Sequence, residues 1–272
     1  MAVTMAEISK LRTMTGAGMM DCKNALTEAE NDFEKAIEII RKKGQAVAAK
    51  RSDREAAEGC VLAKADGGFA AVLALKCETD FVAKNADFVA LTQSILDVAM
   101  AKKPATTEAL AALTIGGQAI SELIIERIGI TGEKMELDFY EFVVGGTTAA
   151  YIHPGNKLAT LVAFAEEGVD YQVARDVAMQ AAAMNPVSLD RASVPAKMIE
   201  TELEVGREKA REEGKPENML EKIAQGRLNK FYQESTLLEQ AFIKDHKLTV
   251  ADYLKANKAT AIAFKRVTLN ME

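Results

Sequence analysis

Two apolar runs, residues 60–64 and 69–77, lie on either side of the tripeptide Asp66-Gly67-Gly68. This arrangement is typical of a β-hairpin, because glycine adopts the positive φ angles that tight turns require. A polar stretch follows, in which Asn85 is the candidate cap of a helix. Apolar residues then recur every three to four positions from 88 to 98, which is the spacing of an amphipathic helix. A hairpin that leads into a helix limits this part of the chain to folds in which helices pack against antiparallel sheet.

The same order of elements recurs about 88 residues further along the chain, counted from the strand at 70–77 to the strand at 158–164. Three strand patterns come first and a helical pattern follows: residues 137–144, 149–153, 158–164 and 173–181. Residues 250–254 and 261–269 have the patterns of a short helix and a strand that could complete the second set. We therefore predict an α+β core with two related halves.

The first 45 residues have the pattern of three short helices. Thr4 and Glu7 have capping-box spacing at the start of the first helix, and Gly16-Ala17-Gly18 separates it from the second. Asn31 can cap the third helix, and Gly44 is predicted to end it. Such a bundle is too small to be very stable alone but large enough to dock on a partner.

The segments on either side of the first hairpin are less regular. Residues 45–58 are alanine-rich and charged, and we interpret them as a linker that is partly helical. Residues 102–107 are predicted to form a loop. A further helix of the first half should then run to about Arg127 and end at Gly129 and Gly132.

Residues 190–231 are highly charged and carry two narrow apolar stripes, separated by Gly214-Lys215-Pro216. The stripes consist of Ile199, Leu203, Gly206 and Ala210, and of Leu220, Ala224, Leu228 and Phe231. Narrow apolar seams with charged flanks predict an antiparallel helical hairpin of the coiled-coil type, with arms about 25–30 Å long. Two roles stay open for this insertion, which could be a structural or dimer-forming arm or a second contact surface.

Length and charge limit the function. A chain of 272 residues is long enough for about two domains. Its net charge of −6 argues against nucleic acid as the main ligand. The basic stretch at 41–54 is more simply a solvated helix end and linker. No apolar run has the roughly 18 residues that a membrane span needs, so we expect a soluble cytoplasmic protein.

Groups suited to covalent or metal chemistry are few. Cys22, Cys60 and Cys77 form no C-x-x-C pair, and their number suggests free thiols in a reducing compartment. The two histidines, His153 and His246, lack a recognisable nucleophile context, and no glycine-rich phosphate loop is present. We therefore expect neither enzyme activity, nor a metal, nor a cofactor. A hydrolase that uses Cys60 or Cys77 stays as an alternative, which a selective thiol probe would detect.

The tetrapeptide Thr79-Asp80-Phe81-Val82 follows the hairpin, at a junction between strand and helix where functional residues often lie. A carboxylate beside an aromatic ring at such a junction is a candidate for a functional loop. The plainer alternative is an ordinary helix start, in which Thr79 caps the helix and Phe81 turns inward.

Two longer phrases favour the functional interpretation. Residues 11–26 read LRTMTGAGMMDCKNAL, which resembles the N-terminal signature of the elongation factor Ts family. Residues 77–83 read CETDFVA and are similar to the internal signature of that family, and Tyr151-Ile152-His153 with Lys157 is a weaker match. The resemblance extends over nearly the whole chain.

The resemblance implies a fold, a partner and a mechanism. The fold would be a UBA-like three-helix domain, a two-part α+β core and a helical hairpin that protrudes from the second part. The partner would be the GTPase elongation factor Tu, from which this chain would promote release of GDP and Mg²⁺. The loop with Thr79, Asp80, Phe81 and Val82 would displace Mg²⁺; other partner contacts would be made by Arg12, Met19, Met20 and His153.

The resemblance also implies domain boundaries: residues 1–53, residues 54–139, residues 140–189 with 232–272, and the hairpin at 190–231. A homodimer or a 2:2 complex through the hairpin stays open. Some family members carry a further C-terminal helix that touches the GTPase, and we expect no such contact here because the sequence ends at Glu272. The main rival hypothesis is a ubiquitin-binding type of helical module attached to an unrelated core.

Overall fold

The computed structural model describes residues 3–269 and combines helices with sheets, in agreement with the predicted α+β class. The chain divides into two compact units. The first is formed by residues 3–62, 73–141 and Leu269, and the second by residues 63–72 and 142–268. Among the described residues, no helix combines the length and the apolar character that crossing a bilayer requires.

Three helices open the first unit: α1 (Met5–Thr15), α2 (Met19–Glu28) and α3 (Phe33–Arg51). The predicted capping box is confirmed, because the Thr4 hydroxyl accepts from the Glu7 amide and the Glu7 carboxylate accepts from the Thr4 amide. The helices bury one apolar cluster between them, formed by Ile8, Leu11, Ala17, Cys22, Ala25, Leu26, Ala29 and Ala36.

The predicted cap of α3 is wrong by one residue. Asn31 has a φ of 67°, whereas an N-cap residue has an extended backbone. Asp32 has that extended backbone, and its carboxylate accepts hydrogen bonds from the amides of Glu34 and Lys35. Glycine or asparagine is favoured at such positive φ angles, so Asn31 belongs to the turn before the helix.

The prediction that Gly44 and Gly129 end their helices is also wrong. Gly44 lies within α3, and Gly129 lies within α7 (Ile120–Thr131). A Cβ atom added to Gly129 would lie 2.7 Å from the Cα of Gly44, closer than real Cβ contacts. The two glycines therefore let the backbones of α3 and α7 cross in contact, and only Gly132, with a φ of 73°, ends α7.

The predicted hairpin is confirmed as β1 (Glu58–Asp66) and β2 (Phe69–Cys77). The strand β5 (Met135–Val144) completes a sheet with the order β1-β2-β5. Nearly every residue of β2 is buried, because the central strand is covered on both faces. Cys77, the last residue of this strand, is fixed by that burial, and the segment after it leads to the candidate site.

After the strand β2, the chain forms two helices, α4 (Asp80–Ala83) and α5 (Ala86–Lys102). The predicted cap at Asn85 is confirmed, because its side chain accepts from the Asp87 amide. The single helix predicted up to Arg127 is wrong. The segment instead forms α6 (Thr107–Ala111), β3 (Thr114–Ile115), β4 (Gln118–Ala119) and α7. Glycines with positive φ at 116 and 117 form the tight turn between β3 and β4.

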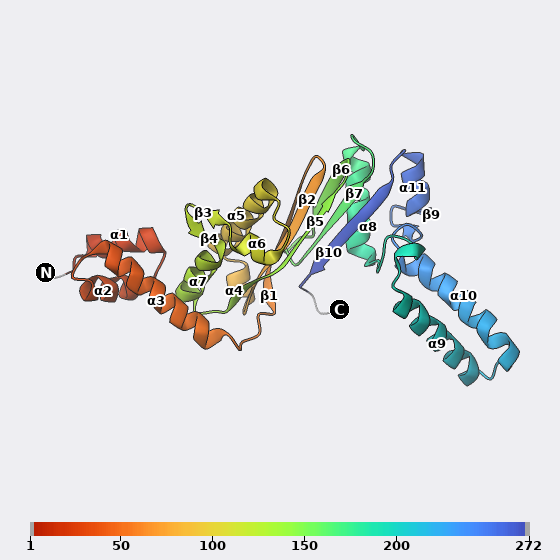
Figure 1. Cartoon of the computed structure of the whole chain (residues 1–272), viewed down its shortest axis with the longest axis horizontal. Helices are drawn as coiled ribbons and strands as arrows, with labels where there is room; N and C mark the ends of the chain where they lie inside the picture. Colours follow the sequence, from red (N-terminus) through yellow and green to blue (C-terminus); the bar gives the residue numbers. More distant parts are fainter. Residues whose placement is uncertain (1–2, 270–272) are drawn as a thin grey trace. The chain divides into compact units, whose positions relative to one another are not determined.

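The second unit contains an antiparallel sheet with the order β10-β7-β6, formed by β6 (Thr147–Ile152), β7 (Leu158–Phe164) and β10 (Ala261–Thr268). The helix α8 (Tyr171–Met184) packs on it (Figure 1). In both sheets the second strand of a hairpin is central, and a strand from later in the chain pairs with its other edge. This shared order is the structural counterpart of the recurrence in the sequence.

The other helices and short strands of the second unit lie between α8 and β10 in the sequence. They are η1 (Arg191–Ser193), α9 (Ala196–Glu212), α10 (Glu217–Ser235), β8 (Ala241–Phe242), β9 (Asp245–Thr249) and α11 (Val250–Ala256). The short strands β8 and β9 were not predicted. Between them, Lys244 forms an ion pair of 2.6 Å with the buried carboxylate of Asp176 on α8. His246 is exposed.

The predicted helical hairpin is formed by α9 and α10, which lie side by side (Figure 1). Gly214 has a φ of 71° in the connection, a conformation that glycine adopts without strain. Gly206 faces Ala224 across the hairpin, and a Cβ atom on Gly206 would lie 2.9 Å from the Cα of Ala224. The two arms therefore depend on a small residue at this crossing.

Two glycine-to-alanine substitutions in this hairpin should have opposite effects. We expect Gly206→Ala to destabilise the protein by about 1–2 kcal/mol, because the new methyl group forces the helices apart. Gly226→Ala should stabilise it by about 0.5–1 kcal/mol, because Gly226 is helical, exposed and faces open space. Thermal unfolding of both variants checks this pair, and shifts of the same sign would contradict the predicted crossing.

Candidate functional site

The predicted site begins where the buried strand β2 ends. Thr79 is the N-cap of α4, with extended backbone at φ −122° and ψ 155°, and its hydroxyl accepts from the Val82 amide at 3.4 Å. This part of the plain alternative, a capped helix start, is correct. In this four-residue helix Ala83 is buried, Asp80 and Val82 are half-buried, and Phe81 is exposed.

Phe81 does not turn inward. Its side chain is 84% exposed, more than any other large apolar residue among those that the structure describes as exposed. Asp80 beside it is half-exposed and pairs with Lys84 at 2.6 Å, one helical turn away. This hydrogen bond raises the pKa of Lys84. An aromatic ring left in water has no role in the stability of its own chain, so it is a candidate for contact with a partner.

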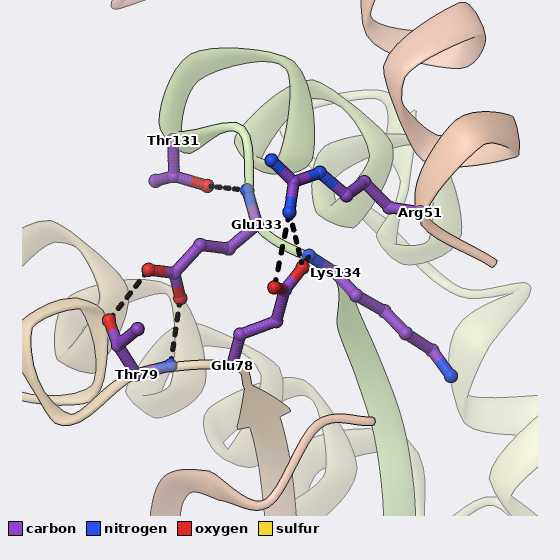
Figure 2. Close-up of polar contacts among 6 residues, drawn as sticks. All are labelled: Arg51, Glu78, Thr79, Thr131, Glu133 and Lys134. Atoms are coloured by element: carbon purple, nitrogen blue, oxygen red, sulfur yellow. Dashed lines mark hydrogen bonds and ion pairs between the residues drawn. The ribbon is translucent and has the colours of Figure 1, made fainter. Parts of the chain in front are cut away.

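Two carboxylates hold the backbone at 78–79, just before Phe81 in the sequence, and at 133–134, across from it (Figure 2). The Glu133 carboxylate accepts from the Thr79 amide at 3.0 Å and from the Thr79 hydroxyl at 2.6 Å. The Glu78 carboxylate accepts from the Lys134 amide at 2.7 Å and pairs with Arg51 at 3.2 Å. The site therefore combines an exposed apolar side chain with a backbone that is held from two sides.

Arg12, Met19 and Met20 lie on the N-terminal helices, away from this junction in sequence and on different elements. All three are exposed. Gly16, with a φ of 69°, ends α1 and Gly18 begins α2, so the glycines of the signature form the turn between the two helices. Cys22 on the same signature is buried in the helical cluster, where burial raises the pKa of its thiol.

His153 belongs to the second unit. It lies in the turn after β6, where its amide donates to the Leu158 carbonyl at 2.8 Å. The imidazole is exposed, and its Nδ1 atom lies 3.1 Å from the Tyr151 hydroxyl. The structure thus gives three separate groups of predicted residues: the junction at 79–82, the N-terminal helices and the turn at His153.

The cysteines do not fit the hydrolase alternative. Cys22, Cys60 and Cys77 are buried thiols that form no disulfide. Burial raises the pKa of the Cys77 thiol to about 12, and the carboxylate of Glu133 adds to the effect. A thiol with this pKa is protonated at neutral pH, whereas a nucleophilic cysteine acts as the thiolate. No cluster of histidine, cysteine and carboxylate side chains within residues 3–269 could hold a metal ion.

Sequence reasoning missed three residues that shape the site: Arg51, Glu78 and Glu133. Glu78 stands next to the tetrapeptide, and Arg51 was seen only as part of a basic stretch. Glu133 is 54 residues from Thr79, and only its position after a helix-ending glycine offered a signal. Contacts at such separations follow from tertiary structure and are not visible in a local pattern.

An exposed ring on a firmly held junction, together with exposed methionines on a small helical bundle, is typical of a protein-docking factor. Comparison with known proteins gives the particular family. The family model described as Elongation factor TS matches residues 78–271. Elongation factor Ts of Porphyromonas gingivalis is 62% identical and that of Azobacteroides pseudotrichonymphae 57% identical, each over the whole of both chains. The chain belongs to the elongation factor Ts family.

Membership of this family confirms the resemblance seen in residues 11–26 and 77–83. It implies a nucleotide-exchange factor that acts on elongation factor Tu in translation. A full-length relative from Phocaeicola vulgatus, also named elongation factor Ts, is 48% identical over an alignment of 331 positions.

Proposed function

We propose that this protein binds elongation factor Tu in its GDP-bound form and promotes release of GDP and Mg²⁺. The observation that carries the proposal is the ring of Phe81, which is 84% exposed on a junction that Glu133 and Thr79 hold. The ring can gain contact area only in a complex. Binding that is favourable only when the GTPase has opened its nucleotide site would drive the release.

Exchange of a nucleotide makes and breaks no covalent bond, so a factor needs no catalytic group for it. It acts by binding best to a GTPase conformation in which contacts to GDP and Mg²⁺ are already lost. Linkage makes the effect mutual, because GDP weakens the factor by the same ratio as the factor weakens GDP. Burial of one Phe side chain contributes about 1.5–3 kcal/mol, which corresponds to a factor of about 10 to 150.

Asp80 has a second part in the proposal. Its carboxylate lies one residue from the ring and pairs with Lys84, which is itself exposed. Exposed ion pairs contribute little to stability, so this pair can be exchanged for new contacts at small cost. In the complex, Asp80 would supply negative charge or a hydrogen-bond acceptor near the phosphates and Mg²⁺. Thr79 would cap the helix of this loop, and Val82 would donate its amide to that cap.

The other surfaces have separate proposed roles. The N-terminal bundle, of UBA-like type within residues 1–53, would dock on the GTPase domain through Arg12, Met19 and Met20. The core would comprise residues 54–139 and residues 140–189 with 232–272, and the turn at His153 would meet another domain of the GTPase. The hairpin at 190–231 would be a coiled coil, with dimer formation and a 2:2 complex still open. Its place of action would be the cytoplasm, where translation occurs.

A fluorescence assay tests the proposed function directly. Elongation factor Tu is loaded with a fluorescent GDP analogue and mixed with this protein and excess unlabelled GDP in a stopped-flow instrument. We expect the release rate to rise with the concentration of the protein and then to saturate. A release rate equal to the spontaneous rate at all concentrations would refute the proposal.

Met19→Asp should weaken the complex by about ten-fold or more, because it places a charge where apolar contact is proposed. Titration calorimetry against nucleotide-free elongation factor Tu measures the affinity. Met219→Asp is a matched control, since Met219 on α10 has the same 44% exposure as Met19. Equal affinity of the Met19 variant and the wild type would contradict the docking surface, and weaker binding of the Met219 variant would instead favour contact through the hairpin.

A further inference from the structure

The segments at 78–79 and 133–134 each offer a carboxylate to the backbone of the other (Figure 2). The Thr79 amide donates to Glu133, and the Lys134 amide donates to Glu78. Hydrogen bonds to a charged acceptor are shorter and stronger than those between neutral groups. This reciprocal arrangement joins the end of β2 to the start of β5 at the level of the proposed contact loop.

Glu133 has a contact that Glu78 lacks. It also accepts from the Thr79 hydroxyl at 2.6 Å, and that hydroxyl in turn accepts from the Val82 amide. Because the hydroxyl proton is directed to Glu133, its lone pairs are free to face the first turn of α4. Hydrogen bonds in such a chain strengthen one another. The carboxylate therefore orients the cap of the helix that carries Phe81.

Glu133 is itself held in place. It follows Gly132, which ends α7, and its amide donates to the Thr131 hydroxyl at 3.3 Å. On the other side, Arg51 at the end of α3 pairs with Glu78 at 3.2 Å. The contacts around the junction thus involve the ends of α3 and α7 and the cap of α4. Among these residues, Glu133 is the one that contacts Thr79.

We propose that Glu133 is a positioning residue, which holds Thr79 so that α4 presents the Phe81 ring in a fixed orientation before the partner binds. This inference rests on the proposed function for its role in exchange, but the positioning itself belongs to the free protein. Ordering the loop in advance removes an entropic cost from complex formation. Loss of the carboxylate should therefore loosen α4 first and slow nucleotide release as a consequence.

Hydrogen exchange of the free protein tests the positioning without a partner. We expect Glu133→Ala to speed exchange in the peptide at 79–85 by about ten-fold, since local opening sets this rate. Glu133→Asp should act in the same direction because its shorter side chain cannot reach both Thr79 atoms. Glu133→Gln should have a smaller effect of the same sign, because its amide keeps one of the two acceptor oxygens but loses the charge. Thermal unfolding shows whether each variant folds. If one of Glu133→Ala and Glu133→Asp folds poorly, the other is enough for the test.

The second unit contains a matched control. The Glu166 carboxylate accepts from the Thr260 amide at 2.8 Å and from its hydroxyl at 2.7 Å, the same two-atom contact far from Phe81 in sequence. Glu166→Ala should speed exchange around residue 260 and leave the peptide at 79–85 unchanged. Unchanged exchange at 79–85 in both Glu133→Ala and Glu133→Asp would overturn the inference, as would equal acceleration there by Glu166→Ala.

A double-mutant cycle in the stopped-flow assay then tests whether Glu133 acts on nucleotide release through Phe81. If Phe81→Ala slows release ten-fold in the wild type, we expect only about a two-fold effect in the Glu133→Ala background, since coupled residues are not additive. A ten-fold effect in both backgrounds would refute the link between the two residues. If Phe81→Ala has no effect even in the wild type, the proposed role of the ring in exchange fails, and hydrogen exchange still decides whether Glu133 positions the loop.

Discussion

Replacing Phe81 by alanine is expected to slow the release of GDP from elongation factor Tu, as stimulated by this protein, about ten-fold or more. The ring is exposed in the free protein, so its removal should leave the free energy of unfolding nearly unchanged. In the proposed complex it is buried, and the lost burial of about 1.5–3 kcal/mol is large enough for that change in rate. Stopped-flow release rates, with thermal unfolding in parallel, measure both quantities.

Tyr171→Ala is the control for this experiment. Tyr171 begins α8 at the corresponding strand-to-helix connection of the second unit, and its side chain is 76% exposed. Its removal takes away similar apolar area without touching the loop at 79–82, so we expect an unchanged release rate. A Phe81 variant as active as the wild type, or equal losses in both variants, would count against a specific role for Phe81.

Gly129→Val should have the largest effect on stability, with a loss of about 2–3 kcal/mol in the free energy of unfolding. The first new carbon atom would lie 2.7 Å from the Cα of Gly44, and neither backbone can move aside as a flexible side chain could. We expect α3 to shift away from α7 and the ion pair between Arg41 on α3 and Glu126 on α7 to weaken with it. Denaturant unfolding gives the change in free energy.

Ser121→Val on the same helix serves as the comparison. Ser121 is exposed in the first turn of α7, so the variant adds a β-branched side chain without a steric conflict. Its effect should stay within about 0.5 kcal/mol. If Gly129→Val were no more destabilising than Ser121→Val, α3 and α7 would not cross as closely as the structure indicates.

Local patterns were enough for elements whose signals lie within a few residues. The capping box at Thr4 and Glu7, the cap at Asn85 and the hairpin around Gly67-Gly68 were all predicted and found. Each depends on a hydrogen bond or a turn between near neighbours, which the residue types alone determine. The family was also accessible from sequence, because the long phrase at 11–26 is specific.

The predicted role of a glycine was wrong where that role depends on contact with a distant segment of the chain. Glycine is common at the ends of helices, yet Gly44 and Gly129 each lie inside a helix. A missing side chain serves equally well for a positive φ angle and for close contact between two backbones, and sequence does not separate these uses. The Gly206 crossing in the hairpin is a further instance of the second use.

The sequence by itself determined the α+β class, the order of most elements and the family, because periodicity, turn residues and signature phrases are properties of neighbouring positions. Only the tertiary structure decided that Phe81 faces solvent and that Glu133 and Arg51 meet the junction from distant segments. The direction of a side chain and its long-range partners depend on how the elements pack. That packing follows from the burial of all apolar residues together and not from any local pattern.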